Sequence, residues 1–185
     1  MWLPAQAAQL LVVLVGIPGS GKSTVAQALI DQAPAERPWQ RVSQDVLGSR
    51  GRCISVAQRA LQEGKHVLID RCNFDEAQRA HWLGLSGPHT HRLAIFLDVP
   101  HEEACRRVLE RSSHEGGVDA ESMSRTKLRS IVGFMQESLS PPRLEEGFEE
   151  VLMAGEREDT RRALAHVQAL AVEMPPPERR ERDRG

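Results

Sequence analysis

The sequence is poor in aromatic residues and cysteine. Its 185 residues include no tyrosine, three tryptophans and four phenylalanines. Proteins that bind single strands usually stack bases on several aromatic side chains, so an extended stacking platform is not expected. The three cysteines, Cys53, Cys72 and Cys105, are odd in number and show no C-x-x-C spacing. This favours reduced thiols in a nuclear or cytoplasmic protein over a disulfide framework or a zinc site.

The sequence also lacks a strong net charge and a long apolar run. Its net charge of −2 would not draw the whole molecule onto duplex nucleic acid, so any such binding must be local. The apolar run at 10–15 is too short to span a bilayer, and no Lys or Arg precedes it. We therefore expect an intracellular protein with no membrane partner. Its oligomeric state stays open.

A glycine-rich motif follows this apolar run directly. Residues 16–24 match the pattern G-x-x-x-x-G-K-[ST], which indicates a phosphate-binding loop between a strand and a helix. Glycine leaves room for phosphate oxygens, Lys22 would reach the β- and γ-phosphates, and the Ser23 hydroxyl would ligate Mg²⁺. The alternative is a chance glycine-rich turn. The candidate nucleotide-binding residues are Gly16, Pro18, Gly19, Ser20, Gly21, Lys22, Ser23 and Thr24.

Short apolar runs alternate with helical periodicity along the chain, which predicts an α/β fold with a parallel sheet. We expect one P-loop domain over 1–173, with a lid at about 106–122, and a disordered tail over 174–185. A long helical stripe ends at Pro141 and Pro142, and a closing helix is expected over 160–172. The expected strands are 10–15, 41–43, 66–69, 92–97 and 150–153.

Two carboxylates follow expected strands, at the end of the sheet where such folds bind ligands. We interpret Asp45 as the general base that takes a proton from an attacking hydroxyl. Asp70 is interpreted as the carboxylate on the metal side. The alternative for Asp45 is a helix N-cap, and for Asp70 a salt bridge with Arg71.

Several basic residues are candidates for phosphate contacts. Arg107 and Arg111 share one face of the expected lid helix, where guanidinium groups could neutralise the transferring phosphoryl group. A solvated face paired with glutamates is the alternative for both arginines. Arg50 and Arg52 follow Asp45 and could hold the phosphate beside a reacting hydroxyl, unless they too lie on an ordinary solvated face. The remaining acceptor candidates are Arg71 and Asn73.

Four segments together resemble the kinase domain of polynucleotide 5′-hydroxyl kinases. They are residues 16–24, 43–48, 68–73 and 146–148. The similarity is stronger to the kinase-like domain joined to aprataxin-type proteins in plants and algae. It implies an adenylate-kinase-like sheet with strand order 2-3-1-4-5 and a small helical lid. It also implies transfer of the γ-phosphate of ATP to the 5′-OH end of DNA or RNA.

The resemblance also implies roles for individual residues. Asp45 would activate the hydroxyl, and Arg107 and Arg111 would contact the phosphates. Many members carry an arginine where this chain has Gln44. Two other functions stay open: a kinase of a small metabolite or nucleoside, and a nucleotide-dependent module that binds nucleic-acid ends without phosphorylating them.

Overall fold

The computed structural model describes residues 7–34, 37–110 and 125–175. Its centre is a five-stranded sheet in the order β2-β3-β1-β4-β5, which confirms the expected topology. All four strand pairs are parallel. The strands are β1 (Gln9–Val15), β2 (Gln40–Ser43), β3 (Val67–Asp70), β4 (Thr90–Phe96) and β5 (Glu150–Met153).

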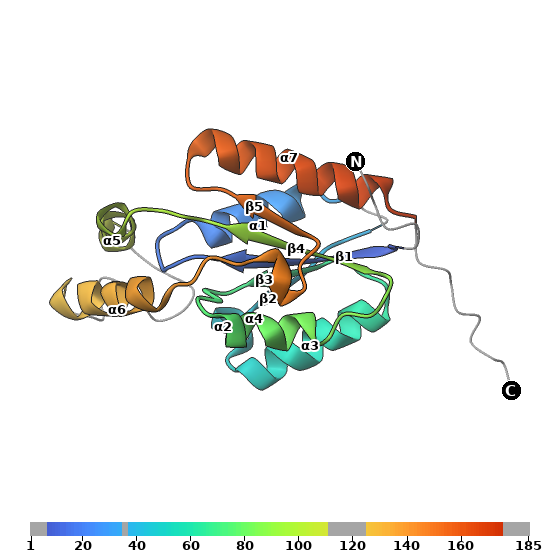
Figure 1. The fold of residues 1–185 in the computed structure, drawn as a ribbon, viewed down its shortest axis with the longest axis horizontal. Helices are drawn as coiled ribbons and strands as arrows, with labels where there is room; N and C mark the ends of the chain where they lie inside the picture. Colours follow the sequence, from blue (N-terminus) through green and yellow to red (C-terminus); the bar gives the residue numbers. More distant parts are fainter. Residues whose placement is uncertain (1–6, 35–36, 111–124, 176–185) are drawn as a thin grey trace, which may run out of the picture.

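Helices cover both faces of the sheet (Figure 1). One face carries α1 (Lys22–Asp31) and α7 (Arg157–Glu173), and the other carries α3 (Arg50–Gln62) and α4 (Glu76–Leu83). Beyond the carboxyl ends of the strands lie α5 (His101–Glu110) and α6 (Arg125–Ser138). The short helices are α2 (Gln44–Leu47) and the 3₁₀ helix η1 (Leu144–Glu146).

The central strand β1 supplies both layers of the core. All seven of its residues are buried. Alternate side chains point to opposite faces of a strand, so Leu10, Val12 and Leu14 pack in the cluster with α1 and α7. Leu11 packs in the second cluster, with α3 and with Trp82 of α4. Burial on both faces explains why this strand is a continuous apolar run.

The local sequence accounts for several helix ends. The side chain of Ser49 caps α3 by accepting a hydrogen bond from the Arg52 N–H, and Asp75 caps α4 in the same way. Helix α6 ends at Ser138, shortly before the expected stop at Pro141 and Pro142. The closing helix is longer than expected by a few residues, and α4 was not anticipated from the periodicity.

Some expectations lie outside the described residues. They include most of the expected lid, from 111 onward, and the tail beyond residue 175. Within the described ranges, no helix is both long and apolar enough to cross a lipid bilayer.

Candidate active site

The glycine-rich loop connects β1 to α1 and packs tightly against α5. Gly19 has a φ of +83°, a conformation that favours glycine. A Cβ atom at this position would lie 2.3 Å from the Ala104 carbonyl oxygen and 2.8 Å from a methyl group of Val108. Any side chain at position 19 would therefore displace the α5 backbone. The glycine is required by both the backbone angle and the close approach.

The first turn of α1 differs from those of α3 and α4. Its N-cap is Gly21, which has no side chain to accept a hydrogen bond, and no acidic residue occupies the first turn. None of the described side chains accepts a hydrogen bond from the N–H groups of residues 22–25. The Val25 N–H donates to the Gly21 carbonyl oxygen at 3.1 Å, and the N–H groups of residues 22–24 have no partner among the described residues. Unpaired N–H groups and the helix dipole together suit an anion. This helix end therefore fits a phosphate group.

Lys22 is held inside the loop that it follows. Its Nζ atom donates hydrogen bonds to the carbonyl oxygens of Gly16 at 2.9 Å and Ile17 at 2.7 Å. The Ser20 hydroxyl lies 3.4 Å from the same nitrogen. The side chain is only 8% exposed, so its charge is kept at the base of the loop. A charged donor in this place suits the oxygens of a bound phosphate.

A pocket of about 240 Å³ opens beside the loop. One side consists of loop and helix residues, among them Gly19, Lys22 and Ser23. The other side is formed by the segments after β2 and β3 and by α6. The Gly16 N–H donates to the Cys72 carbonyl oxygen at 3.0 Å, which joins the two sides at their base. The pocket thus brings together residues that are more than a hundred positions apart.

Asp45 and Asp70 both line this pocket. Asp45 is exposed in the first turn of α2, whose N-cap is Ser43. The N-cap alternative for Asp45 therefore does not apply. Asp70 is only 6% exposed, and its Oδ2 atom accepts hydrogen bonds from Nε of Arg41 at 3.0 Å and from Nη2 at 2.6 Å. The ion pair of Asp70 is thus made with Arg41 of the neighbouring strand rather than with Arg71.

Arg71 lies in the pocket, whereas Asn73 does not. The Arg71 guanidinium lies 5.6 Å from the centre of the Trp82 ring, and burial lowers its pKa. Asn73 has no exposed surface and a φ of +47°. Its amide donates to the Leu14 carbonyl oxygen at 2.7 Å and accepts from the Trp82 indole at 2.8 Å. These core contacts correct our expectation that Asn73 binds the acceptor.

Other predicted residues lie outside the pocket lining. Arg50 and Arg52 are exposed in the first turn of α3. Thr24 is exposed on α1. The Nε atom of Arg107 pairs with Glu103 at 2.8 Å, which is the arrangement of the alternative interpretation. Arg111 lies outside the described residues, so its predicted phosphate contact stays a prediction.

Sequence reasoning missed part of the pocket. Phe74, Gln78 and Met135, here called the acceptor wall, line the pocket along with Asp45. Met135 lies on the apolar stripe of α6, and it also packs against a buried apolar cluster. Gln44 also lines the pocket, and its Oε1 atom is buried without a hydrogen-bond partner among the described atoms. The available signal was the position of Gln44 directly before Asp45 and of Phe74 four residues after Asp70.

Comparisons with known proteins agree with this geometry. The sequence model of a family described as "AAA domain" matches residues 11–130. Transcription factor bHLH140 of Arabidopsis thaliana is 34% identical over 152 residues, which cover 80% of this chain and 16% of that protein. A bifunctional polynucleotide phosphatase/kinase of Schizosaccharomyces pombe is 40% identical over 78 residues, or 42% of this chain and 18% of that protein. The chain thus spans less than a fifth of either relative.

A solved structure of a fungal RNA kinase superposes with a TM-score of 0.67. The superposition covers 94% of both chains at 16% sequence identity, so it demonstrates a shared fold. The sheet of this chain has the strand order of P-loop kinases, so the chain has a P-loop kinase fold. The family model matches well more than half of the residues, and the chain therefore belongs to the AAA domain family.

Proposed function

We propose that this chain is an ATP-dependent kinase domain that phosphorylates the 5′-hydroxyl end of a polynucleotide. The observation that carries the proposal is the shared pocket: Lys22 and Ser23 line one side of a single cavity, and Asp45 lines the other side together with the acceptor wall. The names of the S. pombe relative and of the fungal RNA kinase support a polynucleotide acceptor.

The nucleotide half of the pocket fits a triphosphate with Mg²⁺. The uncapped first turn of α1 and Lys22 would hold the phosphate oxygens. Ser23 and Asp70 offer the oxygen ligands that Mg²⁺ prefers. Bound Mg²⁺ would neutralise charge on the phosphates during transfer. Arg41 would fix the Asp70 carboxylate by holding one of its oxygens.

Asp45 is suited to the role of general base. It is exposed to the pocket, and no hydrogen bond or ion pair ties its carboxylate to another described residue. A carboxylate that is not already engaged can accept the proton of an incoming hydroxyl. Asp45 would therefore take the proton from the 5′-OH as this oxygen attacks the γ-phosphate.

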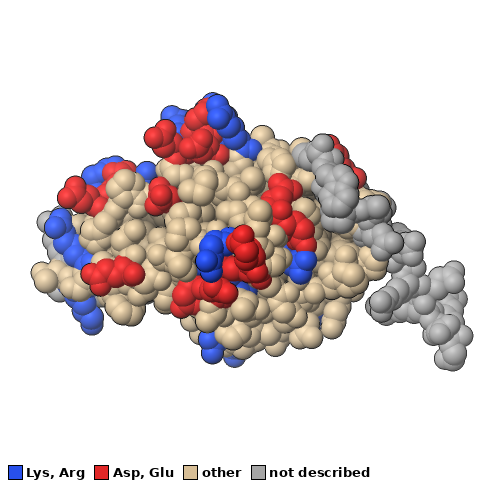
Figure 2. Space-filling model, in the orientation of Figure 1, with Lys and Arg blue, Asp and Glu red and all other residues tan. Residues whose placement is uncertain are grey.

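The acceptor half fits the end of a nucleic-acid strand. Arg71 supplies a positive charge that its contact with Trp82 holds in place. Phe74 and Met135 offer apolar surface against which a terminal base could lie. Figure 2 shows acidic and basic side chains interspersed on the displayed face, without a wide basic patch there. Recognition would thus rest on a few contacts near the reacting end.

The test is transfer of radiolabel from γ-labelled ATP to 5′-OH DNA and RNA oligonucleotides. Asp45→Asn should reduce transfer by about 10²–10⁴-fold and leave ATP affinity, measured by calorimetry, unchanged. Asp31→Asn is the matched control, because Asp31 is an exposed aspartate at the far end of α1. Full activity of Asp45→Asn would contradict the assigned base.

Two further outcomes would overturn the polynucleotide assignment. Phosphorylation of a sugar or nucleoside without any turnover of oligonucleotides would show a small-molecule kinase. Retarded migration of a 5′-OH oligonucleotide in a gel, without labelled product, would show a binding module.

A further inference from the structure

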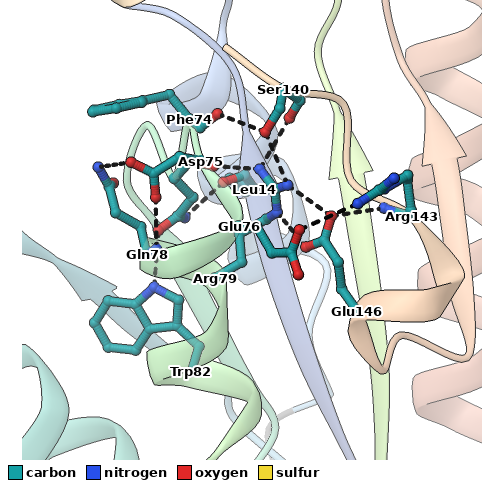
Figure 3. Close-up of polar contacts among 11 residues, drawn as sticks. Leu14, Phe74, Asp75, Glu76, Gln78, Arg79, Trp82, Ser140, Arg143 and Glu146 are labelled. Carbon is teal, nitrogen blue, oxygen red and sulfur yellow. Dashed lines mark hydrogen bonds and ion pairs between the residues drawn. The ribbon is translucent and has the colours of Figure 1, made fainter. Parts of the chain in front are cut away.

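Arg79 of α4 is a buried arginine that makes several hydrogen bonds and has no role in the proposed chemistry. Its side chain is 1% exposed, and all three of its nitrogens donate hydrogen bonds (Figure 3). Nε donates to Glu146 at 2.6 Å, and Nη2 donates to the other oxygen of Glu146 at 2.7 Å. Nη1 donates to the carbonyl oxygens of Asn73 and Ser140, both at 3.0 Å. The guanidinium fork thus joins the stretch 73–79 to the stretch 140–146, whose bonded residues are 61 and 67 positions from Arg79.

Both stretches adjoin the acceptor wall in sequence. Asn73 immediately precedes Phe74, Ser140 follows the helix α6 that carries Met135, and Glu146 lies in η1 before the last strand. The Ser140 N–H also donates to the Phe74 carbonyl oxygen at 2.8 Å. The wall therefore consists of two segments whose junction is at Arg79.

We propose that Arg79 is a positioning residue for the acceptor: it fixes the acceptor wall in place relative to Asp45. This inference rests on the proposed function. A buried ion pair usually adds little net stability compared with apolar residues of similar volume, because both charges lose their water. Its fixed bidentate geometry instead restricts how the joined segments can move.

The nucleotide half has supports of its own, besides the hydrogen bond between Gly16 and Cys72 at the base of the pocket. Gly19 packs on α5, and Lys22 bonds to the carbonyl oxygens of Gly16 and Ile17. Arg79 makes none of these contacts. Loosening the fork should therefore affect the acceptor and the rate of transfer more than ATP binding.

The test is a steady-state comparison of wild type, Arg79→Lys and a control. Lysine keeps the charge and loses the fork. The control is Arg92→Lys, because Arg92 also forms a forked pair, with Glu149, away from the pocket lining. We expect Arg79→Lys to raise KM for the oligonucleotide or lower kcat by about tenfold to a hundredfold in total, and to leave KM for ATP within about threefold. Arg92→Lys should leave both values of KM unchanged.

A second variant covers the case in which Arg79→Lys does not fold. Ser140→Ala removes only the hydroxyl, which lies 3.3 Å from Nη2 of Arg79. This variant should raise KM for the oligonucleotide or lower kcat by a smaller factor, and it should leave KM for ATP unchanged. An equal rise in KM for ATP and for the oligonucleotide overturns the positioning role. So does the absence of any kinetic change in both variants. A wild-type protein that labels no oligonucleotide overturns the proposed function instead, so the two failures are distinct.

Discussion

Substituting Gly19 by alanine should separate backbone strain from steric contact in the glycine-rich loop. Alanine at position 19 must adopt a φ of +83° and place its Cβ 2.3 Å from the Ala104 carbonyl oxygen. Gly48 offers a close match, because its φ is +80° and an added Cβ would meet nothing within 4 Å. The two substitutions therefore share the backbone cost and differ in the clash with α5.

The expected magnitudes follow from these two terms. A left-handed backbone costs a residue other than glycine about 1–2 kcal/mol, and this applies at both positions. Overpacking against a backbone atom adds about 1–3 kcal/mol for Gly19→Ala alone. If the loop relieves this strain by leaving its nucleotide-binding conformation, ATP must restore that conformation on binding. The affinity for ATP then falls about tenfold for each 1.4 kcal/mol that the restoration costs.

Urea unfolding measures the free energy of unfolding, and calorimetric titration measures the affinity for ATP. Gly19→Ala should be less stable than Gly48→Ala by the clash term and should bind ATP more weakly than wild type. Equal destabilisation by the two substitutions, together with unchanged ATP affinity for Gly19→Ala, would refute the close contact between the loop and α5.

Three other predictions concern individual side chains. Burial, reinforced by Arg37, lowers the pKa of His66 to about 4 from its usual 6.5. The unfolded chain binds the proton more readily, so stability is complete above pH 6.5 and falls as the pH decreases, by about 3 kcal/mol at pH 4. Urea unfolding of wild type and His66→Gln across this range checks it, and parallel curves would contradict it. Lys22→Met should weaken ATP binding by about tenfold to a hundredfold in calorimetry, through loss of a charged donor, and unchanged affinity would exclude a phosphate contact. Arg41→Met should cost about 3–5 kcal/mol of unfolding free energy, because the Asp70 carboxylate is left buried without that partner. Adding Asp70→Asn should recover part of the loss, and no recovery would show that the ion pair is not the cause.

The sequence predicted the features that depend on local pattern. Apolar runs located all five strands to within a few residues, and the spacing of glycines, Lys22 and Ser23 placed the phosphate-binding loop between β1 and α1. Such signals are local because strand burial and loop geometry are encoded in neighbouring residues. The strand order came from the family resemblance, and the structure confirms it.

Partners across the sheet could not be predicted in this way. Arg41 reaches Asp70 because Ser43 pairs with Asp70 in the register of β2 and β3, and one sequence does not reveal that register. Asn73 turns into the core because its backbone has a positive φ, which no motif signalled. The fork of Arg79 depends on Glu146, which is 67 positions away. Contacts of this kind depend on the folded arrangement.

The central position of β1 has a consequence for how the chain is synthesised. Its neighbours on both sides, β3 and β4, come later in the chain, and the second of them ends at Phe96. During translation the segment QLLVVLV therefore emerges from the ribosome well before either partner strand has been synthesised. Until then this segment has two open edges and the composition of an aggregation-prone sequence. Expression fragments that stop short of Phe96 should depend on chaperones, whereas fragments that extend past it can close the sheet around β1.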